Sequence, residues 1–364
     1  MKVVLVAGAR PNFMKIAPIF NELKKYKHYF DTILVHTGQH YDYNMSGSFF
    51  RDLELSKPDI FLGIGSGTQA VQTAKIMVEF ERVCLKNKPD LVIVVGDVNS
   101  TLACSLTAAK LCIPIAHVEA GLRSFDRAMP EEVNRVITDH VSDLFFTTCE
   151  DANNNLKREG VSNKKIFFVG NVMIDTLEKL KVKSEESLVL EKIGVRKNGY
   201  VVLTLHRPSN VDDKKTLRNM FEAFRDLGKH IPLVFPVHPR TLKQINRFGI
   251  NFDSKSIKLM EPLGYLDFMK LYMDSKFVLT DSGGIQEETT YLGIPCLTLR
   301  SNTERPITVS EGTNTLVGNN RNKILRESLR ILKGKYKIGK KPKLWDGRTA
   351  QRIVKILIKK FRRD

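Results

Sequence analysis

The sequence contains no long hydrophobic run. None of its apolar stretches approaches the roughly 20 consecutive residues that an α-helix needs to cross a bilayer. The N-terminal apolar stretch is only about seven residues long, and it meets Arg10 and Pro11 without the separate cleavage region of a signal peptide. We therefore expect a buried first strand at this position and a chain without membrane segments.

Cysteine is scarce as well. The five cysteines are odd in number, widely spaced and mostly inside apolar segments, so neither a disulfide framework nor a Cys-x-x-Cys metal site is indicated. This pattern is typical of reduced thiols in the cytoplasm. Asp97 lacks the P-loop lysine and Ser/Thr that accompany a phosphate-bound magnesium, and no Gly-x-Ser-x-Gly elbow is present. The sequence therefore predicts no metal and no serine nucleophile.

Acidic residues are too few to balance the basic ones. The 58 lysines and arginines against 40 aspartates and glutamates leave a net charge of +18, and much of the excess lies in residues 333–343 and 355–363. Nucleic acid is one possible partner for such a surface. The basic residues are not interleaved with stacking aromatics, however, and no known nucleic-acid-binding module is present. We expect no specific nucleic-acid binding, and a surface that attracts anionic substrates accounts for the charge equally well.

The chain is too long for one hydrophobic core. Its 364 residues exceed the roughly 250–300 that a single core organises. Short β-branched runs alternate with helical patterns, which predicts parallel sheets covered by helices on both faces. The predicted strands are 3–8, 31–38, 90–97, 114–121, 143–150, 166–171, 200–206, 231–238, 256–262, 277–284 and 295–300.

A charged stretch up to Lys197 interrupts this pattern before it restarts. We predict two doubly wound α/β domains, an N-terminal one of residues 1–170 and a C-terminal one of residues 171–347. The last helix, within residues 348–364, is amphipathic and is expected to rejoin the first domain.

Polar residues cluster at the ends of the predicted strands. In open α/β sheets, ligands bind outside the carboxyl ends of the strands, where loops lead into helices. The clusters at such ends are residues 10–12, 38–40, 96–101, 117–123, 206–207, 238 and 282–284. Because each domain presents such an edge, the sequence predicts one ligand in a cleft between the two domains.

The run DSGGIQEE, residues 281–288, follows a predicted strand and opens a helix. Its backbone N–H groups can point at an anion while its glycines allow close approach, so a pyrophosphate fits, and a tight turn capped by Ser282 is the alternative. Glu288, one turn into the helix, can accept hydrogen bonds from ribose hydroxyls. Farther along the chain, Arg305 is either a second phosphate contact or half of a surface salt bridge.

A second glycine cluster, residues 63–68, resembles the start of a dinucleotide fingerprint. Thr68 stands where the third glycine is expected, and the apolar stretch before the cluster is short. A flexible loop is therefore favoured over an NAD site.

More ionisable residues lie at the predicted strand ends than ligand binding alone requires. Those at or just after predicted strand ends are Asp97, His117, Glu119, Glu131, Glu132 and His206. Carboxylates that share a cleft raise one another's pKa, which can produce an acid and a base near neutral pH. Each residue also has a structural alternative: Asp97 can cap the following helix, Glu119 can pair with Arg123, and His206 can be a satisfied strand-end histidine.

Nine short segments carry a resemblance to a known family. They are GARPNFMKIAP (8–18), TGQHYD (37–42), GDVNST (96–101), AHVEAGLRS (116–124), MPEEVNR (129–135), HRPSN (206–210), PVHPR (236–240), DSGGIQEE (281–288) and TERP (303–306). In this order they resemble the non-hydrolysing UDP-N-acetylglucosamine 2-epimerases, members of a GT-B-like superfamily with two Rossmann-like domains. The resemblance extends from Lys2 to about Thr315.

The resemblance implies a reaction without a cofactor. UDP leaves in an anti elimination across C1 and C2 to give a bound 2-acetamidoglucal, C2 is protonated from the opposite face, and UDP is added back. UDP-N-acetylglucosamine and UDP-N-acetylmannosamine thereby interconvert. The route needs two proton-transfer groups and no redox cofactor. The family's usual homodimer is implied as well.

The resemblance also implies roles for individual residues. Those that match the family's catalytic residues are Asp97, Glu119, Glu131 and His206. Those that match its nucleotide contacts are Arg10, Lys15, Phe268, Ser282, Gly283, Gly284, Glu288 and Arg305. In this scheme the cations contact phosphates, Phe268 lies near the uracil and Glu288 binds the ribose.

Two segments depart from the family pattern. The common HRREN run reads HRPSN, with Pro208 and Ser209 in place of an arginine and a glutamate, and residues 41–45 differ from bacterial members that a second UDP-N-acetylglucosamine activates. The TGQHYD form is also similar to relatives that epimerise UDP-diacetamido-glucuronic acids, so the substituents on C3 and C6 of the sugar stay open. A hydrolysing epimerase and a retaining glycosyltransferase are the alternative enzymes.

Overall fold

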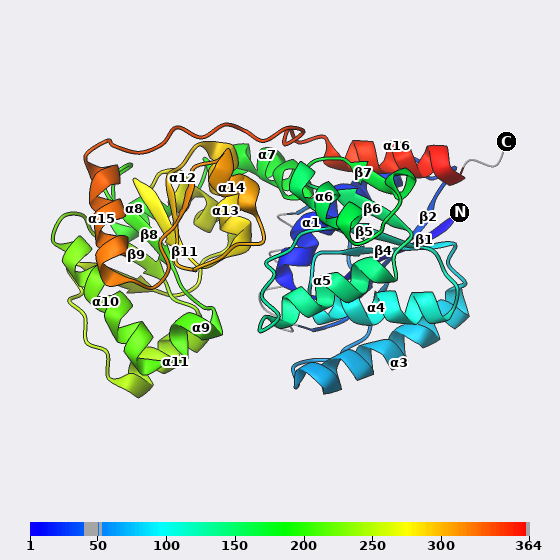
Figure 1. Cartoon of the computed structure of the whole chain (residues 1–364), viewed down its shortest axis with the longest axis horizontal. Coiled ribbons are helices and arrows are strands. Elements are labelled where there is room, and N and C mark those ends of the chain that lie inside the picture. Colours follow the sequence, from blue (N-terminus) through cyan, green and yellow to red (C-terminus); the bar gives the residue numbers. More distant parts are fainter. Residues whose placement is uncertain (40–49, 51–52, 362–364) are drawn as a thin grey trace. The chain divides into compact units, whose positions relative to one another are not determined.

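The computed structural model describes residues 1–39, 50 and 53–361, except for the side chain of Arg10. The chain folds into two compact units: unit 1 comprises Met1–Lys179 and Lys343–Asp364, and unit 2 comprises Leu180–Pro342. Each unit contains one parallel sheet with helices on both faces (Figure 1), so the predicted fold class of two doubly wound α/β domains is confirmed. Within the described ranges, no helix is long and apolar enough to span a membrane.

Unit 1 is built on a seven-stranded sheet in the order β3-β2-β1-β4-β5-β6-β7. Its strands are β1 (Lys2–Ala7), β2 (Asp31–His36), β3 (Ile60–Phe61), β4 (Leu91–Val95), β5 (Ile115–Val118), β6 (Leu144–Thr147) and β7 (Ile166–Phe168). Its helices are α1 (Arg10–Lys24), α3 (Gln69–Asn87), α4 (Asn99–Lys110), α5 (Pro130–His140), α6 (Glu150–Arg158), η1 (Asn163–Lys165), most of α7 (Val172–Ser184) and α16 (Thr349–Phe361). The edge strand β3 was not predicted, because two residues leave no hydrophobic pattern.

The centre of this sheet is covered on both faces. All five residues of β4, LVIVV, are buried, as expected for a parallel strand without an alternation of apolar and polar residues. Helix α4 packs on the central strands through small side chains, among them the fully buried Ala103, Cys104 and Ala108.

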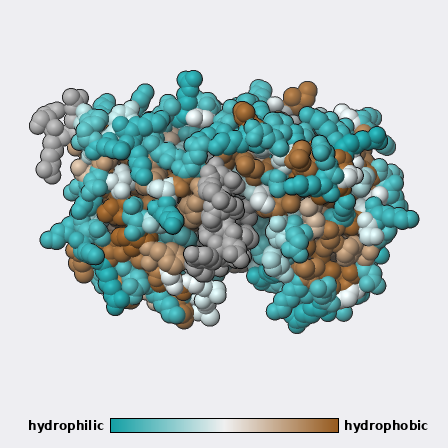
Figure 2. Space-filling view, turned by 180° about the vertical axis from the view of Figure 1, so that it is seen from behind, coloured by the Kyte–Doolittle hydropathy of each residue, from teal (hydrophilic) through white to brown (hydrophobic). Residues whose placement is uncertain are grey.

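The face of the chain drawn in Figure 2 is mostly hydrophilic, with apolar patches between the polar residues, which fits the high content of charged residues.

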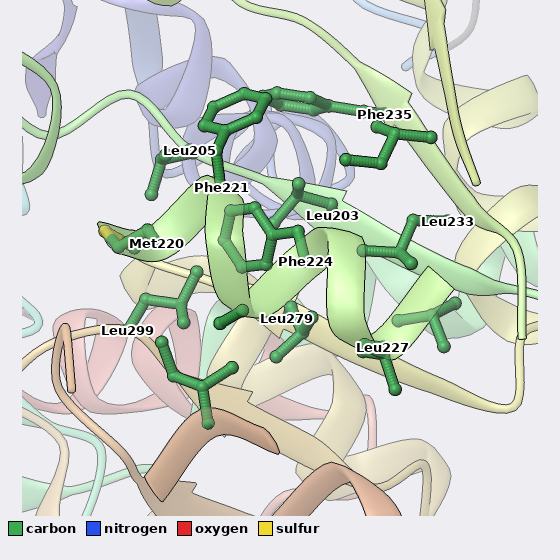
Figure 3. Close-up of a cluster of buried hydrophobic side chains, with 14 of the residues drawn as sticks. Leu203, Leu205, Met220, Phe221, Phe224, Leu227, Leu233, Phe235, Leu279 and Leu299 are labelled. Carbon is green, nitrogen blue, oxygen red and sulfur yellow. The ribbon is translucent and has the colours of Figure 1, made fainter. Parts of the chain in front are cut away.

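Unit 2 repeats the architecture with a six-stranded sheet in the order β10-β9-β8-β11-β12-β13. Its strands are β8 (Val201–Thr204), β9 (Leu233–Pro236), β10 (Ile257–Met260), β11 (Phe277–Thr280), β12 (Cys296–Thr298) and β13 (Asn314–Leu316). Its helices are α8 (Val189–Ile193), α9 (Pro208–Val211), α10 (Lys214–Gly228), α11 (Pro239–Phe248), α12 (Tyr265–Met273), α13 (Gly283–Leu292), α14 (Pro306–Ser310) and α15 (Arg321–Leu332). Phe221 and Phe224 of α10 pack edge to face in its core, beside Leu203 of β8 (Figure 3).

The strand order of each sheet reverses between its first and fourth strands, β1 and β4 in unit 1 and β8 and β11 in unit 2. In unit 2 these strands pair from Val201 and Phe277 to Thr204 and Thr280, whose hydroxyl oxygens are 2.6 Å apart. At such a point the connections leave the sheet in opposite directions, and ligands of open α/β sheets bind at the carboxyl ends there. The two reversal points therefore locate the candidate functional edges.

The C-terminal helix α16 belongs to unit 1, where it packs against α1. Its apolar face, which includes Ile353 and Leu357, is buried. The carboxylate of Asp175 on α7 accepts the N–H groups of Thr349 and Ala350 at 3.0 Å and 2.7 Å. These are among the N–H groups at a helix start that lack a partner within the helix, so Asp175 fixes where α16 begins.

Candidate active site

A lysine and a glutamate form a buried ion pair at the reversal point of unit 1. Lys15 Nζ lies 2.5 Å from Glu119 Oε2, and the two side chains are 8% and 2% exposed. Lys15 belongs to α1, which starts directly after β1 with Pro11 in its first turn, a position that suits proline. Glu119 directly follows β5. The ion pair therefore joins the ends of the strands on either side of β4.

Gly96 leaves room for this ion pair. It directly follows β4 and has a φ of 71°, in the left-handed region. A Cβ atom at this position would lie 3.2 Å from Lys15 Nζ and 3.7 Å from Glu119 Oε2. The backbone conformation and the crowding both favour glycine.

Glu119 has a left-handed backbone too, with a φ of 69°. For a residue with a Cβ atom this conformation costs roughly 1–2 kcal/mol, and it persists only where the surrounding structure enforces it, as it often does at functional sites. The predicted alternative, an ion pair between Glu119 and Arg123, is wrong. Arg123 Nη2 lies 2.7 Å from Asp139 Oδ2, while Glu119 pairs with Lys15.

An arginine holds Asp97, the residue after Gly96. Arg135 on α5 donates its Nε–H to Asp97 Oδ2 at 3.0 Å, and its Nη2 lies 2.9 Å from the same oxygen. The Asp97 side chain is 25% exposed, so it keeps access to solvent or a ligand. The alternative in which Asp97 caps α4 is wrong, because the cap position is Val98 and the aspartate engages Arg135 instead.

Helix α5 carries the other acidic residues of this edge. Glu131 and Glu132 lie in its first turn, and Arg135 follows one turn later. Glu132 is buried, contacts Arg135 and accepts the Ser124 N–H at 2.9 Å, so it is a structural group. Glu131 is half-buried and shares a helix face with Arg135. Arg135 was not singled out from the sequence, although its spacing of three and four residues from two glutamates indicates an ion-pairing residue on this helix.

At the reversal point of unit 2, a buried aspartate orients a histidine. Asp281 follows β11, and its carboxylate accepts the backbone N–H groups of His206 and Arg207 at 2.9 Å and 2.8 Å. His206 Nδ1 lies 2.9 Å from Asp281 Oδ1, and the histidine side chain is 38% exposed. Burial raises the pKa of Asp281, but the His206 charge and these hydrogen bonds outweigh burial and hold the pKa below its usual value. His206 is thus a partnered strand-end histidine whose ring is still accessible.

The segment after Asp281 opens helix α13, as predicted. Ser282 occupies the cap position but makes no side-chain cap bond, so the alternative of a serine-capped turn is wrong. Arg305 adds positive charge to this helix start: a Cβ atom on Gly283 would lie 2.5 Å from Arg305 Nη1. Ser282 and Gly284 are half-buried. A helix N-terminus beside a guanidinium is well suited to bind an anion such as a phosphate.

Arg305 is not part of a surface salt bridge. Its side chain is only 7% exposed, and its Nε lies 2.9 Å from Glu287 Oε1. It also contacts Glu304, whose other oxygen lies 2.8 Å from Arg300 Nη2. Buried charges need such compensation, and the network holds the Arg305 guanidinium at the start of α13.

Helix α12 links Glu288 and Phe268. Tyr265 on α12 donates its hydroxyl to Glu288 Oε1 at 3.0 Å, and Phe268 lies on the same helix, half-buried. Burial raises the pKa of Glu288 to about 7, and the charge of Glu287 acts in the same direction, while hydrogen bonds with Tyr265 and Tyr272 act in the opposite one. Glu288 therefore changes its charge near neutral pH.

The glycine cluster 63–68 is a loop, as favoured from the sequence. Backbone hydrogen bonds tie Ile64 to Thr37 and Gly65 to Gly38, and the Thr68 hydroxyl caps α3.

The structure describes one of the two segments that depart from the family pattern. Pro208 and Ser209 start the short α9 and are exposed. Residues 41–45 lie outside the described residues, and so does the side chain of Arg10.

Metal ligands do not gather in the part of the chain that the structure describes, where no group of three His, Cys, Asp or Glu side chains could hold an ion. His36 and His40 have a His-x-x-x-His spacing in the sequence. His36 Nδ1 accepts the Gly38 N–H at 2.9 Å, and His40 lies outside the described residues.

The predicted site residues thus fall into two sets. The carboxyl edge of unit 1 collects Lys15, Asp97, Glu119 and Glu131, and that of unit 2 collects His206, Phe268, Ser282, Gly283, Gly284, Glu288 and Arg305. The first set has the acids, bases and cations of proton-transfer chemistry. The second has a helix N-terminus, an arginine and a buried carboxyl group, which suit a phosphorylated ligand with hydroxyl groups.

Comparison with known proteins shows the family of the chain. Residues 21–358 match the family model described as UDP-N-acetylglucosamine 2-epimerase. The chain belongs to the UDP-N-acetylglucosamine 2-epimerase family. It is therefore an isomerase, and the resemblance of its nine segments to this family is confirmed.

Two curated relatives of this epimerase differ in the sugar that their names state. The UDP-N-acetylglucosamine 2-epimerase of Methanocaldococcus jannaschii is 46% identical over 98% of this chain and 99% of its own length. The UDP-2,3-diacetamido-2,3-dideoxy-D-glucuronate 2-epimerase of Pseudomonas aeruginosa is 41% identical over 99% of this chain and 100% of its own.

A similar structure has been solved with ligands. The M. jannaschii UDP-N-acetylglucosamine 2-epimerase in complex with UDP-N-acetylglucosamine and UDP superimposes with a TM-score of 0.92 at 44% identity, covering 99% of this chain and 100% of that one. The epimerase described here thus shares its fold over nearly its whole length.

Proposed function

We propose that this epimerase interconverts UDP-N-acetylglucosamine and UDP-N-acetylmannosamine. The observation that carries the proposal is the set of proton-transfer groups at the ends of β4 and β5, where Asp97 and Glu119 follow adjacent strands and Lys15 pairs with Glu119. This set occurs in a chain that is 46% identical to a UDP-N-acetylglucosamine 2-epimerase.

The proposed reaction is an elimination followed by an addition. A base takes the proton from C2 of the sugar, the C1–O bond breaks, and its electron pair leaves with UDP, so that a 2-acetamidoglucal and UDP remain bound. An acid then protonates C2 from the opposite face, and the UDP oxygen bonds to C1 again. Atoms and charge balance without an oxidant or reductant, and no cofactor is required. Asp97, Glu119, Glu131 and His206 are the candidate proton-transfer groups.

The nucleotide half of the substrate is assigned to unit 2. In this proposal the pyrophosphate binds at the start of α13, through Ser282, Gly283, Gly284 and Arg305, while Glu288 accepts ribose hydroxyls and Phe268 lies near the uracil. Their burial and charge support these roles. Lys15 and Arg10 are further phosphate contacts.

Hydrogen exchange at C2 tests the proposal. The protein is incubated in D2O with UDP-N-acetylglucosamine and without nicotinamide, and the sugar is followed by NMR and mass spectrometry. We expect deuterium at C2 and partial conversion to the manno epimer, both slowed at least about 100-fold in Asp97→Asn. Release of free N-acetylmannosamine would instead identify a hydrolysing epimerase, and UDP release that needs an acceptor would identify a glycosyltransferase.

UDP-2,3-diacetamido-2,3-dideoxy-D-glucuronate is the second candidate substrate. It is favoured by the 41% identity to the P. aeruginosa enzyme with that name. The same exchange experiment with both sugars decides between them, because kcat/KM for the natural sugar should exceed that for the other. No exchange at C2 with either sugar would rule out the proposed reaction.

We also propose that the epimerase is a homodimer in the cytoplasm. Helix α3 exposes Val71, Val78 and Leu85 by 47%, 53% and 60%, and their spacing of seven residues puts them on one helix face. Such a stripe supports self-association, and the exposed thiol of Cys112 suits a reducing compartment. Sedimentation velocity should give a dimer for the wild type and a monomer for Val78→Glu/Leu85→Glu, and a monomeric wild type would contradict the assignment.

A further inference from the structure

His117 lies behind the carboxyl edge of unit 1, and both its ring nitrogens face acceptors. Nδ1 is 2.6 Å from Asp139 Oδ1, and Nε2 is 2.9 Å from the carbonyl oxygen of Gly96. The His117 side chain is fully buried. A carbonyl oxygen only accepts, and so does an ionised carboxylate, whereas a neutral imidazole has a single N–H. A neutral His117 would leave one of the two contacts without a proton.

Asp139 is held in its ionised form. Its Oδ2 accepts the Gly121 N–H at 3.0 Å and lies 2.7 Å from Arg123 Nη2. Burial raises the pKa of Asp139, but the charges of His117 and Arg123 and the hydrogen bonds from both outweigh burial and hold the pKa below its usual value. The proton between Asp139 and His117 therefore belongs to the histidine.

Arg123 compensates the charge of Asp139 in the interior, where both side chains are 1% exposed. Arg123 also binds Glu159 with two nitrogens, at 2.8 Å from Nε and 2.6 Å from Nη2. The Glu159 side chain is 26% exposed, so solvent shares in stabilising its charge. The second ring proton of His117 is therefore inferred from the two acceptors that its nitrogens face, not from charge balance.

The contact to Gly96 connects this group with the candidate catalytic residues. Gly96 donates its N–H to the carbonyl of Val118 at 3.0 Å and accepts a hydrogen bond from His117, so β5 holds the peptide groups on both sides of Gly96. Asp97 follows Gly96, and Glu119 follows Val118. His117 and β5 therefore fix the backbone from which the Asp97 and Glu119 side chains project.

We propose that His117 is a positioning residue that carries a proton on both ring nitrogens, holds the Gly96 carbonyl and thereby sets the placement of Asp97 relative to Glu119. It is not a catalytic residue, since a fully buried ring cannot touch the substrate. The kinetic part of this inference rests on the proposed epimerisation, while the charge state of His117 does not.

The charge state is tested by NMR of the wild-type protein with 15N-labelled histidine. The chain has eight histidines, and the signals of two are assigned with His117→Gln and His36→Gln. His36 is the internal reference: burial lowers its pKa to about 4, and its Nδ1 accepts a hydrogen bond. At pH 8 we expect both ring nitrogens of His117 to carry protons and one nitrogen of His36 to be bare. A bare nitrogen on His117 would overturn the inference.

The positioning role is tested by His117→Phe, which keeps a flat ring but cannot donate a hydrogen bond to Gly96. We expect kcat to fall about 100-fold, the loss that follows a displacement of reacting groups by about 1 Å, while the Kd for UDP stays within about twofold. His140→Phe, at an exposed histidine near the end of α5, is the matched control and should retain wild-type kcat. A fall in kcat smaller than about tenfold would overturn the role.

These outcomes separate the two proposals. If the wild-type protein shows no exchange at C2, the proposed function fails, but the NMR experiment still tests the charge of His117. If His117→Gln does not fold, the signals of His117 are assigned by elimination with Gln variants of the other seven histidines, and the wild-type spectrum then decides its charge. If the wild type is active and His117 is neutral, only the further inference fails.

Discussion

Asp97 and Glu119 illustrate how the partner of a carboxylate shapes its chemistry. Asp97 faces an arginine, whose planar guanidinium approaches one carboxylate oxygen with two nitrogens, whereas Glu119 faces the single ammonium nitrogen of a lysine. The Asp97 side chain is also the more exposed of the two, at 25% against 2%. We therefore expect the two residues to act differently in proton transfer although their strands are adjacent.

Replacing a residue of each edge should separate turnover from binding. Asp97→Asn keeps the shape but removes a proton-transfer group, so kcat should fall about 100- to 10,000-fold while UDP binds as before. Ser282→Ala removes one candidate hydrogen bond to phosphate and should weaken UDP binding roughly fivefold to tenfold. Steady-state kinetics and calorimetry with UDP measure the two effects, with the exposed Ser310→Ala as a control. Wild-type kcat in Asp97→Asn would contradict the assignment.

The raised pKa of Glu288 predicts a dependence of stability on pH. Folded protein keeps a proton on Glu288, with a pKa of about 7, that the unfolded chain releases near 4.5. The stability linked to this group is therefore full below pH 4.5 and falls by about 3 kcal/mol as the pH rises through 7. Glu288→Gln should remove that loss, so its stability relative to wild type should increase between pH 5 and pH 8.

Urea unfolding of both proteins at the two pH values measures this difference. Glu311→Gln, at an exposed glutamate of the same unit, should change the stability equally at both pH values and is the control. If the difference in the free energy of unfolding between Glu288→Gln and wild type is the same at pH 5 and pH 8, Glu288 does not hold a proton in the folded protein.

At the scale of elements, most of the candidate site residues lie at the ends of helices and strands. Helix α1 brings Lys15 to the β1 edge, α5 brings Arg135 and Glu131, and α13 presents its N-terminus beside Arg305. Helix α16 contributes no candidate site residue, but its buried face packs on α1, the helix that carries Lys15. Its attachment therefore supports the candidate site from behind.

Asp175→Ala should loosen the start of α16. The variant leaves two helix N–H groups without their carboxylate acceptor, which should destabilise unit 1 by about 2 kcal/mol, the upper end for a lost helix cap. Hydrogen exchange should accelerate in the first turns of α16 and in α1. Asp213→Ala, which removes the exposed cap of α10, is the control and should affect α10 only. Unchanged exchange in α16 would show that its packed face alone holds it.

At the scale of the whole molecule, the two units share an architecture but not a set of side chains. Unit 1 carries the candidate proton-transfer carboxylates, and unit 2 carries His206 together with the arginine and helix start that suit a phosphate. The net charge of +18 favours the approach of an anionic substrate from solution. The candidate proton-transfer groups and the candidate anion-binding groups thus belong to separately folded cores.

UDP should stabilise the protein against unfolding. At a concentration 100 times its Kd, a ligand that binds only the folded state adds about 2.7 kcal/mol. Thermal unfolding with UDP should show this increase, whereas uridine at the same concentration should give little, because it lacks the phosphates for α13 and Arg305. Equal stabilisation by uridine would contradict a phosphate site at this helix start.

The predicted strands and helices follow from local patterns, and so does the placement of most site residues at strand ends. The two exceptions among the strands are short: β3 has two residues and β13 has three, too few for a hydrophobic pattern. Arg135 was missed because an arginine on an amphipathic helix usually faces solvent. Only the packing of α5 shows that its side chain is among the largest that are fully buried.

The sequence by itself determined the fold class, the family and the order of polar segments at the strand ends, because these depend on residues close together in the chain. The tertiary structure decided the partners of the charged groups. Lys15 meets Glu119 across 104 residues, and Asp139 meets His117 across 22. Charge and protonation depend on burial and on the nearest opposite charge, and both are set by neighbours in space rather than in sequence.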